Sequence, residues 1–162
     1  MSKKTSYHPE SYWSDVAKRI KSREGRNVVA GDDEPFYRYK RQRFLEMLKA
    51  VNFEGKSVLE IGNGPGGNLK EISQLNPARL VGADISAEMI KLAKSNNNDF
   101  VELVKIDGTS LPFEDNTFDC VSIAFGLRNV TDKEKALKSI CGSLKKGGKL
   151  IILEFSKPTN ET

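Results

Sequence analysis

The chain has 162 residues, of which 38% are hydrophobic and 30% are charged, proportions typical of one soluble globular domain. No stretch approaches the ~20 apolar residues that a membrane-spanning helix needs, and the first residues, Met-Ser-Lys-Lys-Thr-Ser, lack the apolar core of a signal peptide. We therefore expect a cytoplasmic protein with no transmembrane segment. Cys120 and Cys141 are not spaced as metal ligands, so no metal site is predicted and both thiols are expected to be buried and reduced.

The formal net charge of +4 comes from the N-terminal third of the chain. Residues 1–56 hold 13 Lys/Arg against 8 Asp/Glu, a net charge of +5, whereas residues 57–162 hold 13 against 14, a net charge of −1. Lys18, Arg19 and Lys21 recur at helical spacing, which favours a solvated helix face. No basic run interleaved with aromatic residues indicates a nucleic-acid partner. A peripheral contact with an anionic membrane stays open.

Periodicity predicts two helices in the first part of the chain, over residues 10–23 and 36–51, joined by a turn-rich loop over residues 24–35. One face of the first helix is expected to hold Tyr12, Val16 and Ile20. One face of the second is expected to hold Phe44, Leu45, Leu48 and Val51. The aromatic residues of this segment, Trp13 among them, either close a ligand crevice or anchor the helices to a sheet.

Residues 57–68 read Ser-Val-Leu-Glu-Ile-Gly-Asn-Gly-Pro-Gly-Gly-Asn, an apolar strand followed by a glycine-rich turn and the start of a helix. Gly62, Gly64 and Gly67 satisfy the pattern G-x-G-x-x-G, in which glycines allow a tight turn and let a ligand approach the backbone. Ordinary turns also contain such clusters, so the pattern alone leaves both interpretations open.

Glu60 precedes the first glycine by two residues and is expected at the carboxyl end of its strand, facing the ligand crevice. A carboxylate there would repel a pyrophosphate, whereas it would attract a cation. S-adenosylmethionine carries a sulfonium and an ammonium group and no phosphate. Glu60 therefore favours S-adenosylmethionine over NAD or FAD as the cofactor.

After the glycine-rich turn, apolar segments alternate with helical patterns. Strands are predicted over residues 78–84, 100–106, 118–125 and 148–155, and helices over residues 86–95, capped by Ser86, and 132–144. This alternation predicts an α/β fold, a Rossmann-like parallel sheet of about five strands with helices on both faces. We expect a single domain over residues 1–162, with a helical N-terminal cap (1–54) and a cofactor-binding core (55–162).

Two acidic residues end predicted strands. Asp84 lies 22 residues after Gly62, which matches the acidic residue that binds ribose hydroxyls in dinucleotide folds; the alternative is a helix cap. Asp107, followed by Gly108, ends the next strand, where an Asp-Gly turn is the alternative to a ligand-binding role.

The run from Val58 to Gly66 resembles the first motif of the class I S-adenosylmethionine-dependent methyltransferases. Two runs in the C-terminal half, Phe125-Gly-Leu-Arg-Asn-Val130 and Leu153-Glu-Phe-Ser-Lys-Pro158, look like the ubiquinone/menaquinone biosynthesis C-methyltransferases. This resemblance implies a methyltransferase that acts on a small molecule, with a quinone-precursor aromatic ring as the candidate acceptor and S-adenosylhomocysteine as the product.

The resemblance also implies which residues bind the cofactor. They are Glu60, Gly62, Asn63 and Gly64 for the methionine part, Asp84 and Ile85 for the ribose and the adenine edge, Asp107 and Gly108 for adenine, and Phe125 on the route to the methyl group. Methyl transfer from a sulfonium depends mainly on alignment and exclusion of water. No general base is assigned; His8, the only histidine, is expected to be exposed.

The class I fold continues beyond a fifth strand with a further helix and two strands, which are apparently missing because this chain ends at Thr162. The fifth strand is therefore expected to form a sheet edge beside Leu150-Ile-Ile-Leu153, where a homodimer or an added strand would pair. Two alternatives stay open: a non-catalytic or truncated cofactor-binding or interaction module, and a nicotinamide-dependent oxidoreductase. The sequence does not specify the methyl acceptor or whether C, O or N is methylated.

Overall fold

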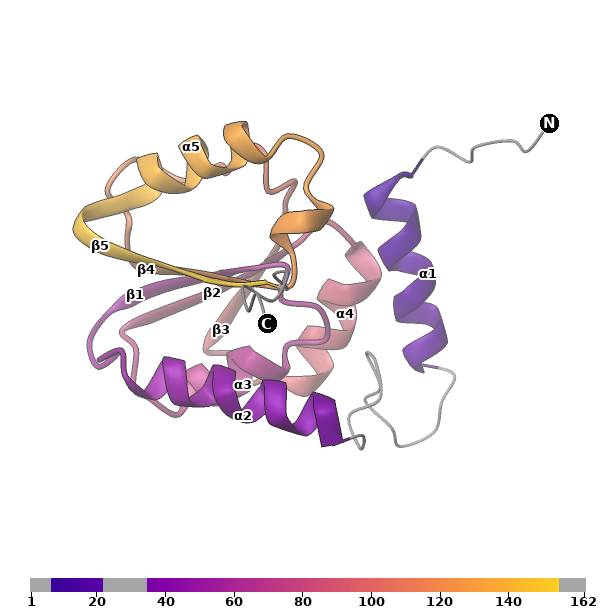
Figure 1. Cartoon of the computed structure of the whole chain (residues 1–162), viewed down its shortest axis with the longest axis horizontal. Helices are drawn as coiled ribbons and strands as arrows, with labels where there is room; N and C mark the ends of the chain where they lie inside the picture. Colours follow the sequence, from indigo (N-terminus) through magenta and orange to yellow (C-terminus); the bar gives the residue numbers. More distant parts are fainter. Residues whose placement is uncertain (1–6, 22–34, 155–162) are drawn as a thin grey trace, which may run out of the picture.

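The computed structural model describes residues 7–21 and 35–154 of the chain (Figure 1). Residues 24–34 of the predicted connector (24–35) and residues 155–158 of the C-terminal motif lie outside the described residues. The helices and strands in chain order are α1 (Pro9–Lys21), α2 (Pro35–Lys49), β1 (Ser57–Ile61), α3 (Gly67–Ser73), β2 (Arg79–Asp84), α4 (Ala87–Asn96), β3 (Val101–Lys105), β4 (Phe118–Ala124), the 3-10 helix η1 (Leu127–Asn129), α5 (Lys133–Ser143) and β5 (Leu144–Leu153).

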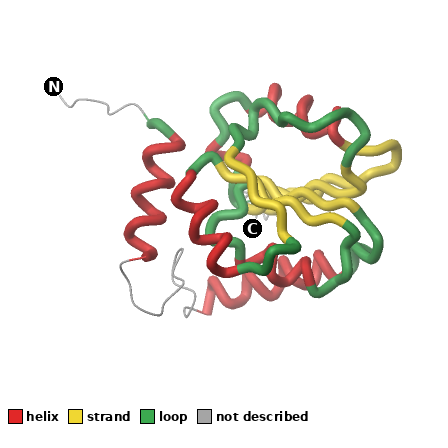
Figure 2. Tube along the Cα trace, turned by 180° about the vertical axis from the view of Figure 1, so that it is seen from behind, coloured by secondary structure: helices red, strands yellow, loops and turns green. Residues whose placement is uncertain are grey.

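The strands form one parallel sheet in the order β3-β2-β1-β4-β5, with β1 between β2 and β4. Helices α2, α3 and α4 lie on one side of the sheet and α5 lies on the other (Figures 1 and 2). Both faces of β1 are buried, because Val58 packs in the cluster with α2 and α3 while Leu59 packs in the cluster with α5. The predicted Rossmann-like architecture is confirmed.

Helix α1 packs against α4 through a face that includes Val16 and Ile20, as predicted, but not Tyr12. Ala17 and Ile20 are buried at 1% and 7% exposure, and they cluster with Met89 of α4. Tyr12 is 48% exposed, so its placement on the buried face is wrong. Trp13, Ala17 and Ile20 share one helix face because of their i, i+4, i+7 spacing, so Trp13 rather than Tyr12 faces inward.

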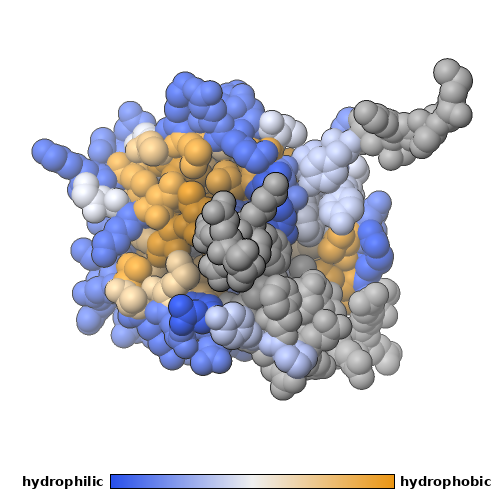
Figure 3. All heavy atoms as spheres, in the orientation of Figure 1, coloured by the Kyte–Doolittle hydropathy of each residue, from blue (hydrophilic) through white to orange (hydrophobic). Residues whose placement is uncertain are grey.

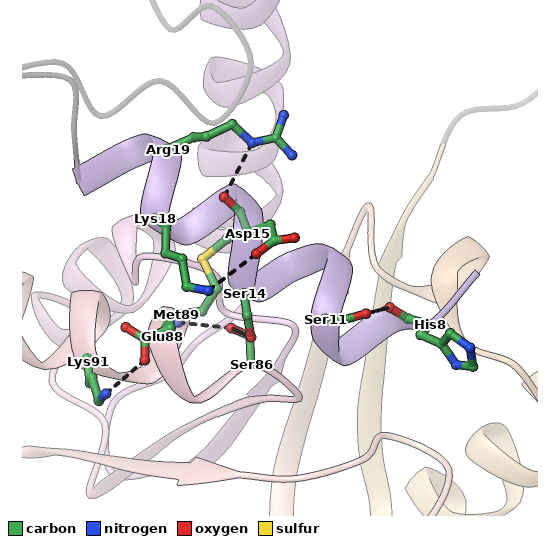
Figure 4. A network of polar contacts seen from close by, with 10 residues as sticks. All are labelled: His8, Ser11, Ser14, Asp15, Lys18, Arg19, Ser86, Glu88, Met89 and Lys91. Atoms are coloured by element: carbon green, nitrogen blue, oxygen red, sulfur yellow. Dashed lines mark hydrogen bonds and ion pairs between the residues drawn. The ribbon is translucent and has the colours of Figure 1, made fainter. Parts of the chain in front are cut away.

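Polar contacts also join α1 to the core (Figure 4). The hydroxyls of Ser14 and Ser86 lie 3.0 Å apart, and Ser86 Oγ accepts a hydrogen bond from the backbone N–H of Met89 at 3.2 Å. The predicted cap of α4 by Ser86 is therefore confirmed. Glu10 of α1 forms an ion pair with Lys105 of β3.

The start of β5 and one cysteine differ from expectation. Leu144 pairs with Phe118 while Lys149 pairs with Cys120, so residues 145–148 bulge out and the strand begins before the expected residue 148. Cys120 is buried and burial raises the pKa of its thiol to about 11, but Cys141 is exposed, so the expectation that both thiols are buried is wrong.

The strand β5 lies at one edge of the sheet and pairs only with β4 within the described residues. Hydrophobic residues form much of the molecular surface in this region (Figure 3). Among them, Ile152 of β5 is 38% exposed. Within residues 7–21 and 35–154, every helix is too short or too polar to cross a membrane.

Candidate functional site

A cavity of about 440 Å³ opens where the carboxyl ends of β1, β2, β3 and β4 meet. This is the position at which open α/β sheets bind ligands, beside the strand where the order reverses. The cavity is lined by Pro9, Trp13, Ile61, Gly62, Asn63, Gly64, Pro65, Ala83, Asp84, Ile85, Met89, Ile106, Asp107, Gly108, Ile123, Ala124, Phe125, Gly126, Arg128, Asn129, Val130 and Thr131. Eight of the nine predicted cofactor-binding residues are among them, and Glu60 is the exception.

The glycine loop after β1 needs glycine at three positions, because Gly62, Gly64 and Gly66 have φ angles of 71°, 51° and 84°. The first two residues of the loop are tied to β2, since the N–H groups of Gly62 and Asn63 donate to the carbonyl of Ala83 at 2.7 and 3.1 Å. The loop is thereby held against the end of the neighbouring strand.

Asp84 is 7% exposed and fastens the loop to the start of α4. Its Oδ2 accepts from the N–H of Gly64 at 3.0 Å, and its Oδ1 accepts from the N–H of Ser86 at 2.9 Å. Burial raises the pKa of this carboxyl, and the backbone hydrogen bonds partly oppose that shift. A carboxylate offers about four acceptor sites, so Asp84 can accept from a ligand in addition to these backbone groups. The cap of α4 is supplied by Ser86, so Asp84 is not the helix cap.

Asp107 and Gly108 line the cavity just after the end of β3. Asp107 Oδ1 accepts from both the backbone N–H and the hydroxyl of Thr109, each at 2.9 Å. These bonds make a local turn, so the turn interpretation holds while the residue also faces the cavity.

Glu60 lies behind the glycine loop, at 1% exposure. Side chains alternate along β1, so Leu59 packs toward α5 and Glu60 points toward α3, where its Oε1 accepts from Asn68 Nδ2 at 2.8 Å. Its Oε2 is buried with no partner among the described residues. Burial raises the pKa of this carboxyl to about 8, with a further increase from nearby Asp84. The expectation that Glu60 faces the crevice is therefore wrong.

Phe125 adopts a strained backbone conformation at the end of β4, with a φ of 54° for a non-glycine residue. Its N–H donates to the carbonyl of Leu153 at 2.7 Å, and its carbonyl accepts from Asn129 Nδ2 at 3.2 Å. These two bonds hold the turn that leads from β4 into η1 at the cavity wall.

Arg128 is the residue that the sequence interpretation missed. Its guanidinium lies 5.7 Å from the centre of the Phe125 ring, and its Nη1 lies 3.4 Å from both carboxylate oxygens of Glu154. Arg128 is the one basic side chain among the described lining residues. The run Phe125-Gly-Leu-Arg-Asn-Val130 pointed to it, but only the folded chain brings Glu154 and the cavity to its side.

Helix α1 closes one wall of the cavity with Pro9 and Trp13. Trp13 packs edge-on against Tyr12, with ring centres 5.1 Å apart, while His8 is exposed and does not line the cavity. Within the described residues, α1 contributes to the cavity wall and α2 does not. Trp13 both lines the cavity and packs against the cluster that joins α1 to α4.

This strand order, with a glycine loop after β1, Asp84 at the end of β2 and Asp107 shortly after β3, defines a Rossmann-like fold for nucleoside-containing ligands. Solved structures identify it as the class I methyltransferase fold. The DhpI-SAM-HEP complex matches with a TM-score of 0.76 and 25% identity, over 96% of this chain and 70% of that chain. A SAM-dependent methyltransferase from Aquifex aeolicus matches with a TM-score of 0.69 and 20% identity, over 96% and 78%.

The chain belongs to the ubiE/COQ5 methyltransferase family, whose model matches residues 36–162. The ubiquinone/menaquinone biosynthesis C-methyltransferase UbiE of Hahella chejuensis is 49% identical over 113 residues, which is 65% of this chain and 45% of that protein. The UbiE of Pseudomonas savastanoi is 47% identical over 127 residues, 74% of this chain and 49% of that protein. The chain spans about half the length of these relatives.

Proposed function

We propose that the chain is the cofactor-binding part of an S-adenosylmethionine-dependent methyltransferase whose acceptor is a small aromatic quinone precursor. The observation that carries this proposal is the single cavity that joins the glycine loop and Asp84 at one end to Phe125 and Arg128 at the other. The relatives named as ubiquinone/menaquinone C-methyltransferases support the acceptor class. Residues 1–54 and 55–162 are proposed to act as one domain.

The cavity suits a nucleoside with no phosphate. Its volume of about 440 Å³ falls in the range of small-molecule sites. The buried Asp84 carboxylate can accept from two neighbouring ribose hydroxyls, a role that fits any ribose-containing ligand. Arg128, the one described basic lining residue, belongs to η1 and not to the glycine loop. These features favour S-adenosylmethionine over a nicotinamide dinucleotide.

When bound, S-adenosylmethionine supplies a methyl group activated by its sulfonium, so the chain has to bind, align and exclude water. Pro9 and Trp13 of α1 cover the cavity, which limits access of water. The Phe125 ring offers an apolar surface to an aromatic acceptor, and the Arg128 guanidinium stabilises an ionised ring hydroxyl. An ionised hydroxyl makes the ring carbons beside it more nucleophilic, which suits C-methylation.

Calorimetric titration tests the cofactor assignment. We expect S-adenosylmethionine and S-adenosylhomocysteine to bind the wild-type chain with micromolar Kd, and Asp84→Asn to weaken binding by about 100-fold, because a neutral amide loses the charge-assisted bonds to two hydroxyls. Asp99→Asn makes the same chemical change at an exposed aspartate outside the cavity and is expected to leave the Kd unchanged. Binding of NADH instead would make the chain an oxidoreductase, and a folded chain that binds neither ligand would be an inert module.

The edge of β5 supports the proposal that the chain pairs through this strand as a homodimer. An exposed edge offers unpaired backbone groups to a second strand, and Ile152 adds apolar area to it. We expect light scattering to show a dimer that Ile152→Lys converts to a monomer. Phe100→Lys, at another exposed apolar residue, just before β3, should leave the dimer intact. A monomeric wild-type chain would contradict this proposal. Cytoplasmic location and peripheral membrane contact stay predictions.

A further inference from the structure

The C-terminal end of α4 contacts the glycine loop through two residues, Asn96 and Asn97, that do not themselves line the cavity. Asn96 Nδ2 donates to the carbonyl of Pro65 at 3.0 Å. Asn97 Nδ2 donates to the carbonyl of Gly66 at 3.1 Å and to that of Ala93 at 2.9 Å. The side-chain amides of Asn96 and Asn97 thus bind the successive carbonyls of Pro65 and Gly66 in the loop, about 30 residues earlier in the sequence.

The carbonyl of Gly66 also begins α3, because it accepts from the N–H of Lys70 at 3.2 Å. The N–H of Gly66 donates back to the carbonyl of Asn63 at 2.9 Å, which closes the turn that contains Gly64. Peptide groups are planar, so fixing the carbonyls of residues 65 and 66 also fixes the N–H groups of residues 66 and 67. Asn97 therefore sets the orientation of the loop as well as the start of α3.

Asn97 packs so closely that no other side chain fits at residue 66. A Cβ added to Gly66 would lie 2.3 Å from Asn97 Nδ2 and 3.2 Å from the Cα of Ala93. The carbonyls of Gly66 and Ala93 both accept from the amide nitrogen of Asn97, which fixes the orientation of this amide group. Its Oδ1 is then buried with no partner among the described residues. The two hydrogen bonds that Asn97 donates offset the cost of burying this acceptor without a partner.

We infer that Asn97 is a positioning residue for cofactor binding: it holds the Gly66 carbonyl so that Gly62 and Gly64 keep the conformation that lines the cavity. Asn96 assists through Pro65. The inference rests on the proposed function, since the loop is taken as the cofactor site. Helix α4 carries Ser86 at its other end, where Ser14 of α1 docks, so this helix holds both the loop and the cap (Figures 1 and 4).

Three adjacent asparagines allow a matched test by titration of the purified chain with S-adenosylhomocysteine. Asn97→Asp keeps the size of the side chain but removes both donors, and it is expected to raise the Kd about ten-fold. Asn96→Asp removes one exposed donor and is expected to raise it two- to three-fold. Asn98→Asp makes the same change where no side-chain contact with the loop is present, and the Kd should stay at the wild-type value.

Amide hydrogen exchange of residues 62–70 in the free protein gives a second readout. Asn97→Asp should speed exchange there more than in β1, because the loop loses its anchor while the sheet keeps its own. If the wild-type chain does not bind S-adenosylhomocysteine, the proposed function is wrong. Amide hydrogen exchange alone then tests whether Asn97 positions the loop. If wild type binds and Asn97→Asp binds equally well, Asn97 has only a structural role. Should Asn97→Asp not fold, Asn97→Ala, which adds no charge, decides between the same two results.

Discussion

Glu60→Gln is expected to stabilise the protein, and increasingly so as pH rises from about 5 to 8. Glutamine has the size of the protonated side chain and can accept the bond from Asn68. It also brings a donor to the region of the unpartnered Oε2. The wild-type carboxyl lies buried, and its pKa rises from 4.5 to about 8 on folding. Between these two values the unfolded chain releases a proton that the folded chain keeps, so wild-type stability falls as pH rises.

The expected slope is about 1.4 kcal/mol per pH unit over this window, which sums to a few kcal/mol by about pH 8. Urea unfolding at about pH 5, 6.5 and 8 measures the difference in the free energy of unfolding between wild type and Glu60→Gln. The contributions of most other ionisable groups cancel in this difference. Glu102→Gln is the control, because Arg79 lowers the pKa of the Glu102 carboxyl below 4.5. Its loss of stability should therefore be constant between about pH 5 and 8. A gain for Glu60→Gln that does not change with pH would show that the carboxyl is already ionised at low pH.

Gly66→Ala is expected to lower the free energy of unfolding by about 2 to 4 kcal/mol, or the Tm by roughly 10 °C. The φ of 84° is unfavourable for alanine, and the new Cβ would lie 2.3 Å from Asn97 Nδ2 and 3.1 Å from Ala93 Cβ. Asn97 would have to leave the loop, so binding of S-adenosylhomocysteine should weaken as well. Calorimetric unfolding and titration measure the two effects.

Gly67→Ala is the matched control one residue along the chain. Gly67 is the first residue of α3, and nothing lies within 4 Å of a Cβ added there. Alanine has the higher helix propensity, so stability should stay equal or rise by up to about 1 kcal/mol. Equal losses for the two variants would show that the loop does not require a left-handed conformation at residue 66.

The parallel sheet and the cavity were predictable because their signals are local. Strand β1 enters a glycine loop, the loop enters a helix, and Asp84 ends β2, so the carboxyl ends of the strands had to meet at one edge. The cap at Ser86 is likewise a property of one short segment. Each of these features depends on backbone geometry over a few residues.

The sequence by itself determined the class of fold, the glycine loop and the carboxylates that end β2 and β3. Only the tertiary structure decided that Glu60 points behind the loop toward Asn68, that Trp13 rather than Tyr12 faces inward, that Arg128 meets Glu154, and that Asn97 holds Gly66. Periodicity tells which residues share a face, but it does not tell which neighbour covers that face. That choice depends on how segments far apart in the chain pack, and each packing contact forms only when the whole sheet is assembled.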